Sequence, residues 1–319
     1  MILLTISKEE ANSRLLRFLN KLLPKAPNSF WYKAVRTKKI RLNQRHVKEL
    51  SLILAEGDVL SIYVTDQQLM EFGYKAQEKA IKPHTTPSIE VLYEDDALLV
   101  INKPRGILTQ KAKASDISLT EAARQYLYEK GYPQSATFQP SFCHRLDRNT
   151  SGVLIMAKTL KAQQVITSHL KDHSIEKLYL ALVKGQPLIW KEETLLTHVY
   201  RKDPVNNKAM ILDPQQAKEG DQECRLTVSL VETYRDASLL QIHLLTGKSH
   251  QIRAQLSHMG YPILGDGKYD PKEKSYQQML TAHAVVFHGL EEDFAYLNEK
   301  RIEAPLPKDM TRYIQQAKR

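Results

Sequence analysis

The chain has 319 residues, and its 46 basic side chains outnumber its 36 acidic ones, which gives a net charge of +10. An apolar share of 42% is ordinary for a globular protein and excludes a disordered or collagen-like chain. The length favours about two domains, and no apolar run approaches the roughly 20 residues that span a bilayer.

The first sixty-five residues are predicted to form a small α+β unit. A first helix is predicted from apolar residues at i, i+3, i+4 and i+7, namely Leu15, Phe18, Leu19 and Leu22. A second short helix is expected around Trp31, with Asn28 or Ser29 as its cap. Short strands are predicted within 40–47 and 59–64.

The positive charge is concentrated in this N-terminal unit. Residues 1–50 contain 12 basic and 3 acidic side chains, a net charge of +9. The other 269 residues contain 34 basic and 33 acidic side chains, a net charge of +1. Such an asymmetry indicates a module that binds a polyanion, joined to a nearly neutral body.

The rest of the chain is predicted to be a linker and a larger body. Residues 66–87 are polar, contain two prolines and are expected to be the linker. From 88 to 319 we expect an α+β body with a mixed, largely antiparallel sheet flanked by helices. Its predicted strands lie at 89–104 (two strands), 152–157, 178–183, 225–231 and 238–245. Helices are expected after Thr159 and from His250 to Met259.

The segment HRLDRNTSG at 144–152 is the most unusual stretch of the chain. Its Asn, Thr, Ser and Gly residues suit a turn that presents side chains outward. Asp147 lies between Arg145 and Arg148, whose positive charge favours an ionised carboxylate. A loop with an ion pair and no chemical role is the alternative interpretation.

Two further segments carry candidate functional residues. LLTGKSHQIRAQLSHMGYPILGD at 244–266 places His250 and Arg253 at i and i+3 on one face of the predicted helix. An amphipathic helix with a solvated face is the alternative. Tyr179 lies in EKLYLALVKG at 176–185, where a core or edge aromatic is the usual interpretation.

Taken in this order, these segments closely resemble the RluA-type family of RNA pseudouridine synthases over about residues 88–308. HRLDRNTSG matches the family segment HRLDxxTSG, and the 244–266 segment matches LLTGRTHQIRxHLxxxGxPIxGD. INKPRGIL at 101–108, EKLYLALVKG and APLP at 304–307 match the family's other motifs. The first sixty-odd residues resemble an S4-type RNA-binding domain, with Leu16 at the usual Asp position.

The resemblance implies roles for individual residues. Asp147 would be the catalytic carboxylate, either a nucleophile or a base, with Arg253 paired to it and Tyr179 stacked on the uracil. Arg145 would enter the space that a flipped uridine leaves in the RNA. The implied substrate-binding residues are Arg145, His144, Arg148, Lys103, Lys248 and His250. The implied RNA-binding residues of the N-terminal module are Arg14, Arg17, Lys33, Arg36, Lys38, Lys39 and Arg41.

The reaction implied by the resemblance breaks the uridine N1–C1′ bond, turns the base and rejoins it through C5. It involves no net redox change and no hydrolysis, so we expect no cofactor and no metal. The chain also lacks the HExxH, P-loop and GxGxxG motifs. Cys143 and Cys224 are far apart, which favours a reducing cytoplasmic setting, and the N-terminus does not match a signal peptide.

The resemblance favours large-subunit ribosomal RNA as the substrate, with transfer RNA as the alternative. We expect a monomer that binds RNA and no membrane. Two other classes of function are alternatives. One is a non-catalytic S4-type RNA-binding protein, and the other is a metal-dependent RNA hydrolase built on scattered His and Asp residues.

Overall fold

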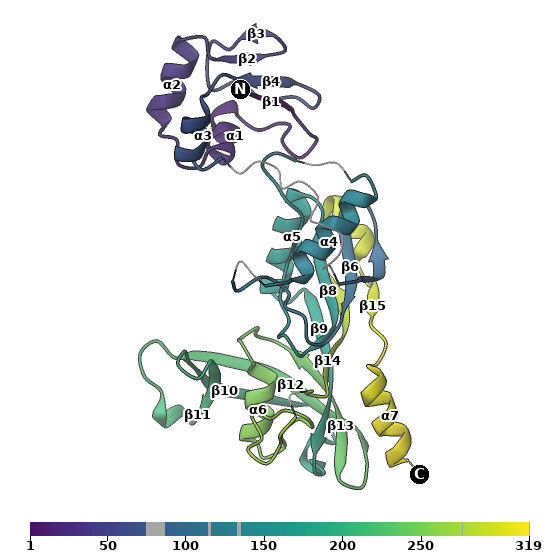
Figure 1. The fold of residues 1–319 in the computed structure, drawn as a ribbon. Coiled ribbons are helices and arrows are strands. Elements are labelled where there is room, and N and C mark those ends of the chain that lie inside the picture. Colours follow the sequence, from purple (N-terminus) through teal and green to yellow (C-terminus); the bar gives the residue numbers. More distant parts are fainter. Residues whose placement is uncertain (75–86, 114–115, 133–134, 276, 319) are drawn as a thin grey trace. The chain divides into compact units, whose positions relative to one another are not determined.

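The structure, a computed structural model, describes residues 1–74, 87–113, 116–132, 135–275 and 277–318 (Figure 1). The chain forms two compact units. The first groups Met1–Thr85, Glu121–Ser141 and Lys158–Ala162, and the second groups Thr86–Thr120, Phe142–Ala157 and Gln163–Arg319. The expected division into domains at 1–65, 66–87 and 88–319 remains a prediction.

A four-stranded antiparallel sheet and three helices make up the N-terminal part of the first unit. The sheet has the order β1-β4-β2-β3 and consists of β1 (Ile2–Thr5), β2 (Ile40–Leu42), β3 (Arg45–His46) and β4 (Val59–Ile62). The helices are α1 (Leu15–Leu22), α2 (Asn28–Arg36) and α3 (Asp66–Glu71). The four apolar residues that predicted α1 are all buried, so the helical prediction is confirmed.

The start of α2 differs from the prediction. The helix begins at Asn28 after Pro27, which has the extended backbone of a cap residue, and no side chain caps the helix. The Asn28 side chain accepts a hydrogen bond from Asn20 of α1 at 2.9 Å instead. The predicted cap at Asn28 or Ser29 was therefore wrong, because the fixed φ of proline already suits a helix start.

Part of the expected linker is helical. The Thr65 hydroxyl accepts from the Gln68 amide at the start of α3, and the Gln68 side chain accepts from the Thr65 amide. This capping box satisfies two of the helix's free N–H groups. Leu69 and Phe72 pack against the N-terminal core. The remainder of the expected linker, from 75 to 86, lies outside the described residues.

The second unit is built on an eleven-stranded mixed sheet. Its order is β11-β10-β12-β13-β9-β14-β8-β6-β5, with β15 on β14 and β7 on β8. All pairings along this order are antiparallel except β14 with β8. Its strands are β5 (Glu90–Glu94), β6 (Leu98–Lys103), β7 (Ser141–Phe142), β8 (Ser151–Ala157), β9 (Ile175–Lys184), β10 (Thr194–Asp203), β11 (Lys208–Leu212), β12 (Gln222–Thr233), β13 (Ala237–Leu244), β14 (Leu280–Phe287) and β15 (Arg301–Glu303). The predicted mixed, largely antiparallel sheet is confirmed.

The parallel contact between β8 and β14 depends on one glycine. Gly152 pairs with Ala282 and has a φ of 111°. A Cβ added at Gly152 would lie 2.1 Å from the Ala282 carbonyl oxygen. Only glycine permits this approach, so this residue places the loop before β8 beside β14.

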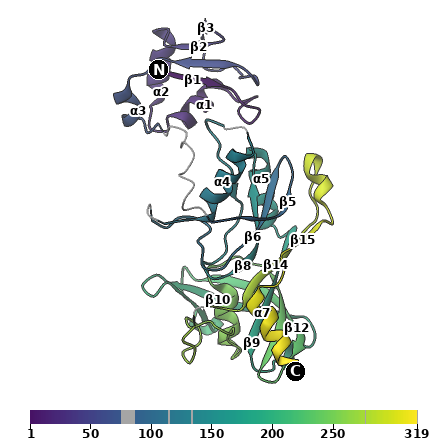
Figure 2. The same ribbon diagram turned by 45° about the vertical axis from the view of Figure 1, so that its right-hand side comes forward.

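Two of the remaining helices pack against strands of this sheet. The helices after α3 are α4 (Leu119–Glu129), α5 (Leu160–Lys171), α6 (Gln251–His258) and α7 (Lys308–Ala317). Ala254 of α6 is buried with Tyr200 and Ala209 of the β10–β11 hairpin. Met310 of α7 is buried with Leu182 of β9, and Figure 2 shows α7 running beside this part of the sheet. The α+β class is confirmed.

Candidate active site

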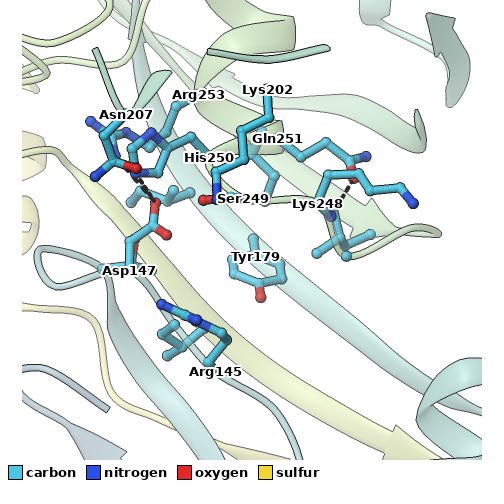
Figure 3. Close-up of a pocket in the computed structure, with 16 residues that line it drawn as sticks. Arg145, Asp147, Tyr179, Lys202, Asn207, Lys248, Ser249, His250, Gln251 and Arg253 are labelled. Carbon is cyan, nitrogen blue, oxygen red and sulfur yellow. Dashed lines mark hydrogen bonds and ion pairs between the residues drawn. The ribbon is translucent and has the colours of Figure 1, made fainter. Parts of the chain in front are cut away.

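A pocket of about 240 Å³ lies in the second unit. Segments that are far apart in the sequence line it, among them the loop before β8, strand β9, the β10–β11 hairpin and the stretch from the end of β13 into α6 (Figure 3). Six of the predicted site residues are among its lining residues, namely Asp147, Tyr179, Arg253, Arg145, Lys248 and His250.

The Asp147 carboxylate lies beside two nitrogen-bearing side chains. Its Oδ2 accepts a hydrogen bond from Arg253 Nη1 at 3.2 Å, and His250 Nε2 lies 3.8 Å from the same oxygen. About a quarter of the Asp147 side chain is exposed. The carboxylate is thus oriented from one side by a cation and remains open to the pocket on the other.

Arg253 is held by a second, fully buried carboxylate. Its Nε and Nη2 donate to the two oxygens of Asp266 at 2.7 Å each, a bidentate pair, and Asp266 is 1% exposed. Burial acts to lower the pKa of Arg253, but the carboxylates of Asp266 and Asp147 outweigh it and raise the pKa. A bidentate pair fixes the plane of a guanidinium, so Nη1 is aimed at Asp147.

His250 precedes α6 rather than lying in it. Its backbone φ is 56°, in the left-handed region that residues with a Cβ rarely adopt. Its Nδ1 lies 3.0 Å from the Tyr269 hydroxyl. Burial lowers the pKa of His250, which favours the neutral ring, although the nearby Asp147 charge opposes this. His250 and Arg253 both lie beside the Asp147 carboxylate.

Tyr179 projects from β9 into the pocket and is 6% exposed. Burial raises the pKa of its phenol, with the Asp147 charge adding to the effect. The ring therefore stays neutral and presents an aromatic surface at the pocket, where a planar base could stack.

Lys103, predicted to bind substrate, is fully buried and does not line the pocket. Its Nζ donates to the backbone carbonyls of Pro104, Arg148 and Thr150 at 3.0, 2.9 and 2.8 Å. Burial lowers the pKa of Lys103 to about 7. This geometry does not support a substrate contact. Lys103 holds the loop that carries Asp147.

His144 and Arg148 also lie outside the pocket lining. His144 Nε2 accepts a hydrogen bond from the Ile155 amide of β8 at 3.2 Å, and burial lowers the pKa of its ring to about 3. A neutral ring that accepts a hydrogen bond from the backbone supports a structural role for His144 rather than the predicted substrate contact. Arg148 is exposed, and its carbonyl accepts from Lys103 and from the Gly106 amide.

Replacing Lys103 by Met should destabilise the loop. The three backbone carbonyls would lose a shared donor, and a buried polar group without a partner costs about 1–3 kcal/mol. We expect Lys103→Met to lower the free energy of unfolding by about 3 kcal/mol in chemical denaturation, and to reduce activity through the misplaced loop. Lys113→Met, at an exposed position, is the control. A Lys103→Met variant as stable as the parent would contradict this role.

Several residues of the site were not predicted. Lys202 and Asn207 line the pocket from the β10–β11 hairpin, where no motif marked them. Asp266 and Tyr269 act through their contacts with Arg253 and His250. Asp266 ends the quoted segment 244–266, so the signal was present, but sequence spacing alone does not show which side chain it contacts.

The described residues contain no group of three or more His, Cys, Asp and Glu side chains arranged to hold a metal ion. No helix among them is long and apolar enough to cross a membrane.

Known proteins are similar to this chain in sequence and in fold. The RNA pseudouridylate synthase family matches residues 97–258, just over half of the chain. Ribosomal large subunit pseudouridine synthase C of Yersinia pestis is 30% identical over 313 residues, covering 95% of this chain and 92% of that protein. The same-named protein of Escherichia coli strain K12 is 28% identical over 327 residues, covering 98% and 95%.

A solved structure supports the fold. Human RNA pseudouridylate synthase domain containing 4 aligns with a TM-score of 0.57 at 19% identity, covering 72% of this chain and 93% of that one. The family match and the bacterial relatives show that the chain is an RNA pseudouridine synthase, an isomerase. The chain belongs to the RNA pseudouridylate synthase family, and within it to the RluA type. This membership favours the isomerase over the non-catalytic RNA-binding protein and the metal-dependent hydrolase.

Proposed function

We propose that this enzyme converts specific uridines of large-subunit ribosomal RNA to pseudouridine, with Asp147 as its catalytic carboxylate. The names of the bacterial relatives support the ribosomal substrate. The observation that carries the proposal is the placement of Asp147 in the pocket. Arg253 orients it there, and it faces the same space as Tyr179 and Arg145 (Figure 3).

The pocket residues can perform each part of the reaction. Asp147 acts on the ribose while the N1–C1′ bond breaks. It is either a nucleophile whose bond to C1′ breaks again when C5 bonds there, or a base that takes the C2′ proton and later returns it. The uracil turns on the Tyr179 ring, and C5 bonds to C1′. C5 then loses its proton, and N1 gains one. Atoms and electrons balance without an external oxidant or water molecule. Arg253 keeps the carboxylate oriented throughout.

A uridine within a stem must first leave its stack, which costs a few kcal/mol. Arg145 is exposed and two residues from Asp147 in the same loop. We propose that its guanidinium enters the space that the flipped base leaves, where it can stack on and donate to the neighbouring bases. It thereby holds the RNA open while the uridine is in the pocket.

A second pocket of about 600 Å³ can hold the nucleotides next to the modified uridine. It shares Lys202 and Lys248 with the first pocket, and Lys218 adds a third cation. Arg201 also lines it but is engaged by Asp221, to which it donates at 2.8 and 2.6 Å. The three lysines are therefore the candidate phosphate contacts.

The N-terminal unit is the second proposed RNA contact. A groove of about 560 Å³ is lined by Arg14, Arg36 and Lys48 together with Tyr32, which is 61% exposed. An exposed aromatic ring among cations suits an unpaired base with its phosphates. Of the predicted RNA-binding set, Arg17, Lys33, Lys38 and Lys39 are also exposed, whereas Arg41 is half-buried over the Tyr63 ring.

Neutralising this groove should weaken RNA binding in a salt-dependent way. Each phosphate contact contributes about 0.7 to the slope of log affinity against log salt for a single strand. In the full chain, Arg14→Gln, Arg36→Gln and Lys48→Gln together should reduce the slope by about 2, without slowing turnover at saturating RNA. Exposed Lys171, Lys191 and Lys308, changed to Gln together, form the control. Equal slopes in all three proteins would show that the groove does not touch RNA.

The substrate is tested directly with purified protein. It is incubated separately with large-subunit ribosomal RNA and with transfer RNA that lack modifications, and pseudouridines are then mapped. New pseudouridine at defined positions of the ribosomal RNA supports the proposal, and conversion of transfer RNA alone favours the alternative substrate. We further propose that the enzyme acts as a monomer in the cytoplasm, which the mass of the protein in solution and its cellular location test.

A further inference from the structure

Tyr269 connects one wall of the active-site pocket to the side chains around Asp147. It lies in the segment after Asp266, outside the pocket lining. Its hydroxyl oxygen accepts a hydrogen bond from the Ala209 amide of β11 at 2.7 Å. The same hydroxyl lies 3.0 Å from His250 Nδ1. One side chain thus binds both the β10–β11 hairpin and a neighbour of Asp147.

The directions of these hydrogen bonds follow from the chemistry of the phenol. Burial raises the pKa of Tyr269 to about 12, so the hydroxyl keeps its proton. The Ala209 contact occupies a lone pair, which leaves that proton to be donated to His250 Nδ1. A neutral imidazole that accepts at Nδ1 carries its own proton on Nε2, the nitrogen that faces Asp147.

The ring of Tyr269 also supports Arg253. The Arg253 guanidinium carbon lies 5.0 Å from the ring centroid, a distance at which a cation is attracted to an aromatic face. Arg253 is therefore held by Asp266 along its edge and by Tyr269 on its face. Both groups that approach Asp147 consequently depend on the position of one tyrosine.

The hairpin that Tyr269 binds carries pocket residues of its own. Lys202 and Asn207 line the pocket from β10 and the hairpin loop. Lys268, next to Tyr269, donates from its Nζ to the Asn207 carbonyl at 2.6 Å. Lys268 and Tyr269 together attach the hairpin at two points, Asn207 and Ala209, to the segment that positions His250 and Arg253.

We propose that Tyr269 is a positioning residue that ties the β10–β11 hairpin to the side chains around Asp147, so that RNA seated on Lys202 sets the catalytic geometry. This inference rests on the proposed function, in which Asp147 is the catalytic carboxylate and Lys202 contacts the RNA. Tyr269 itself touches neither the uridine nor the reacting atoms.

The test is Tyr269→Phe in the full chain, which removes the hydroxyl and keeps the ring over Arg253. We expect the single-turnover rate at saturating RNA to fall about tenfold or more, with the RNA Kd changed by less than about twofold. Tyr269→Leu should lower the rate further because the ring is lost as well. Tyr261→Phe, whose ring packs on Trp190 at 5.2 Å outside the pocket lining, is the matched control. Thermal denaturation verifies that each variant is folded.

A double-mutant cycle with Lys202→Ala tests the connection to the hairpin. Part of the rate loss of Lys202→Ala should disappear when Tyr269 is already Phe, so the two losses should not add. Additive losses, or a Tyr269→Phe variant with the parent rate, would overturn the inference. Asp147→Asn on the same RNA separates it from the proposed function. An active Asp147→Asn contradicts the proposed function, whereas an inactive one beside a fully active Tyr269→Phe overturns only the inference.

Discussion

Replacing Asp147 by Asn is expected to lower the rate of pseudouridine formation by about 10³-fold or more, since a group that reacts covalently or removes a proton has no substitute in the pocket. The amide keeps the size of the side chain and can still contact Arg253, so the fold should be retained. RNA affinity should be kept or slightly increased, because the change removes a negative charge near the phosphates.

The measurement is single-turnover conversion at saturating RNA, with affinity measured on the same RNA. Asp96→Asn, at an exposed turn position, is the matched control and should convert RNA at the parent rate. An Asp147→Asn rate within about tenfold of the parent would rule out Asp147 as the catalytic carboxylate, because loss of such a group costs far more.

Arg253→Ala is expected to damage both catalysis and stability, and to damage RNA affinity little. The variant leaves Asp266, which is 1% exposed, without its bidentate partner. Breaking a buried ion pair from one side costs about 3–5 kcal/mol. Asp147 would also lose the donor that orients it. If the measured loss is mainly in RNA affinity with a normal rate, Arg253 is a phosphate contact instead.

A double variant separates the two effects of Arg253. Arg253→Ala with Asp266→Ala removes both members of the buried pair, so no charge is left buried without a partner. We expect stability in chemical denaturation to recover by at least about half of the single-variant loss. The conversion rate should stay low, because Asp147 remains without its orienting donor. Recovery of the rate together with stability would show that Arg253 acts on the fold alone.

The sequence predicted the elements whose patterns are local. The helical spacing of Leu15, Phe18 and Leu22 identified α1, and Thr159 caps α5 as expected, accepting from the Ala162 amide at 3.0 Å. Strand β14 was not predicted, because a run buried on both faces has no alternation of polar and apolar residues.

Only part of the chemistry of the site could be predicted from the sequence. Asp147 and Arg253 are 106 positions apart, and their pairing was available only through the family resemblance. The contacts that hold Arg253, made by Asp266 and Tyr269, are set by tertiary structure and leave no spacing signal. The substrate contact of Lys103 was predicted through the resemblance. Lysine is seldom buried, but here three backbone carbonyls surround its ammonium group.

We propose that this chain modifies large-subunit ribosomal RNA through Asp147. The most direct measurement is a pseudouridine map of ribosomal and transfer RNA from cells that lack the gene, restored with either the parent protein or Asp147→Asn. We predict that defined pseudouridines in large-subunit RNA disappear with the gene, return with the parent protein and stay absent with Asp147→Asn. An unchanged ribosomal map, or restoration by Asp147→Asn, would contradict the account.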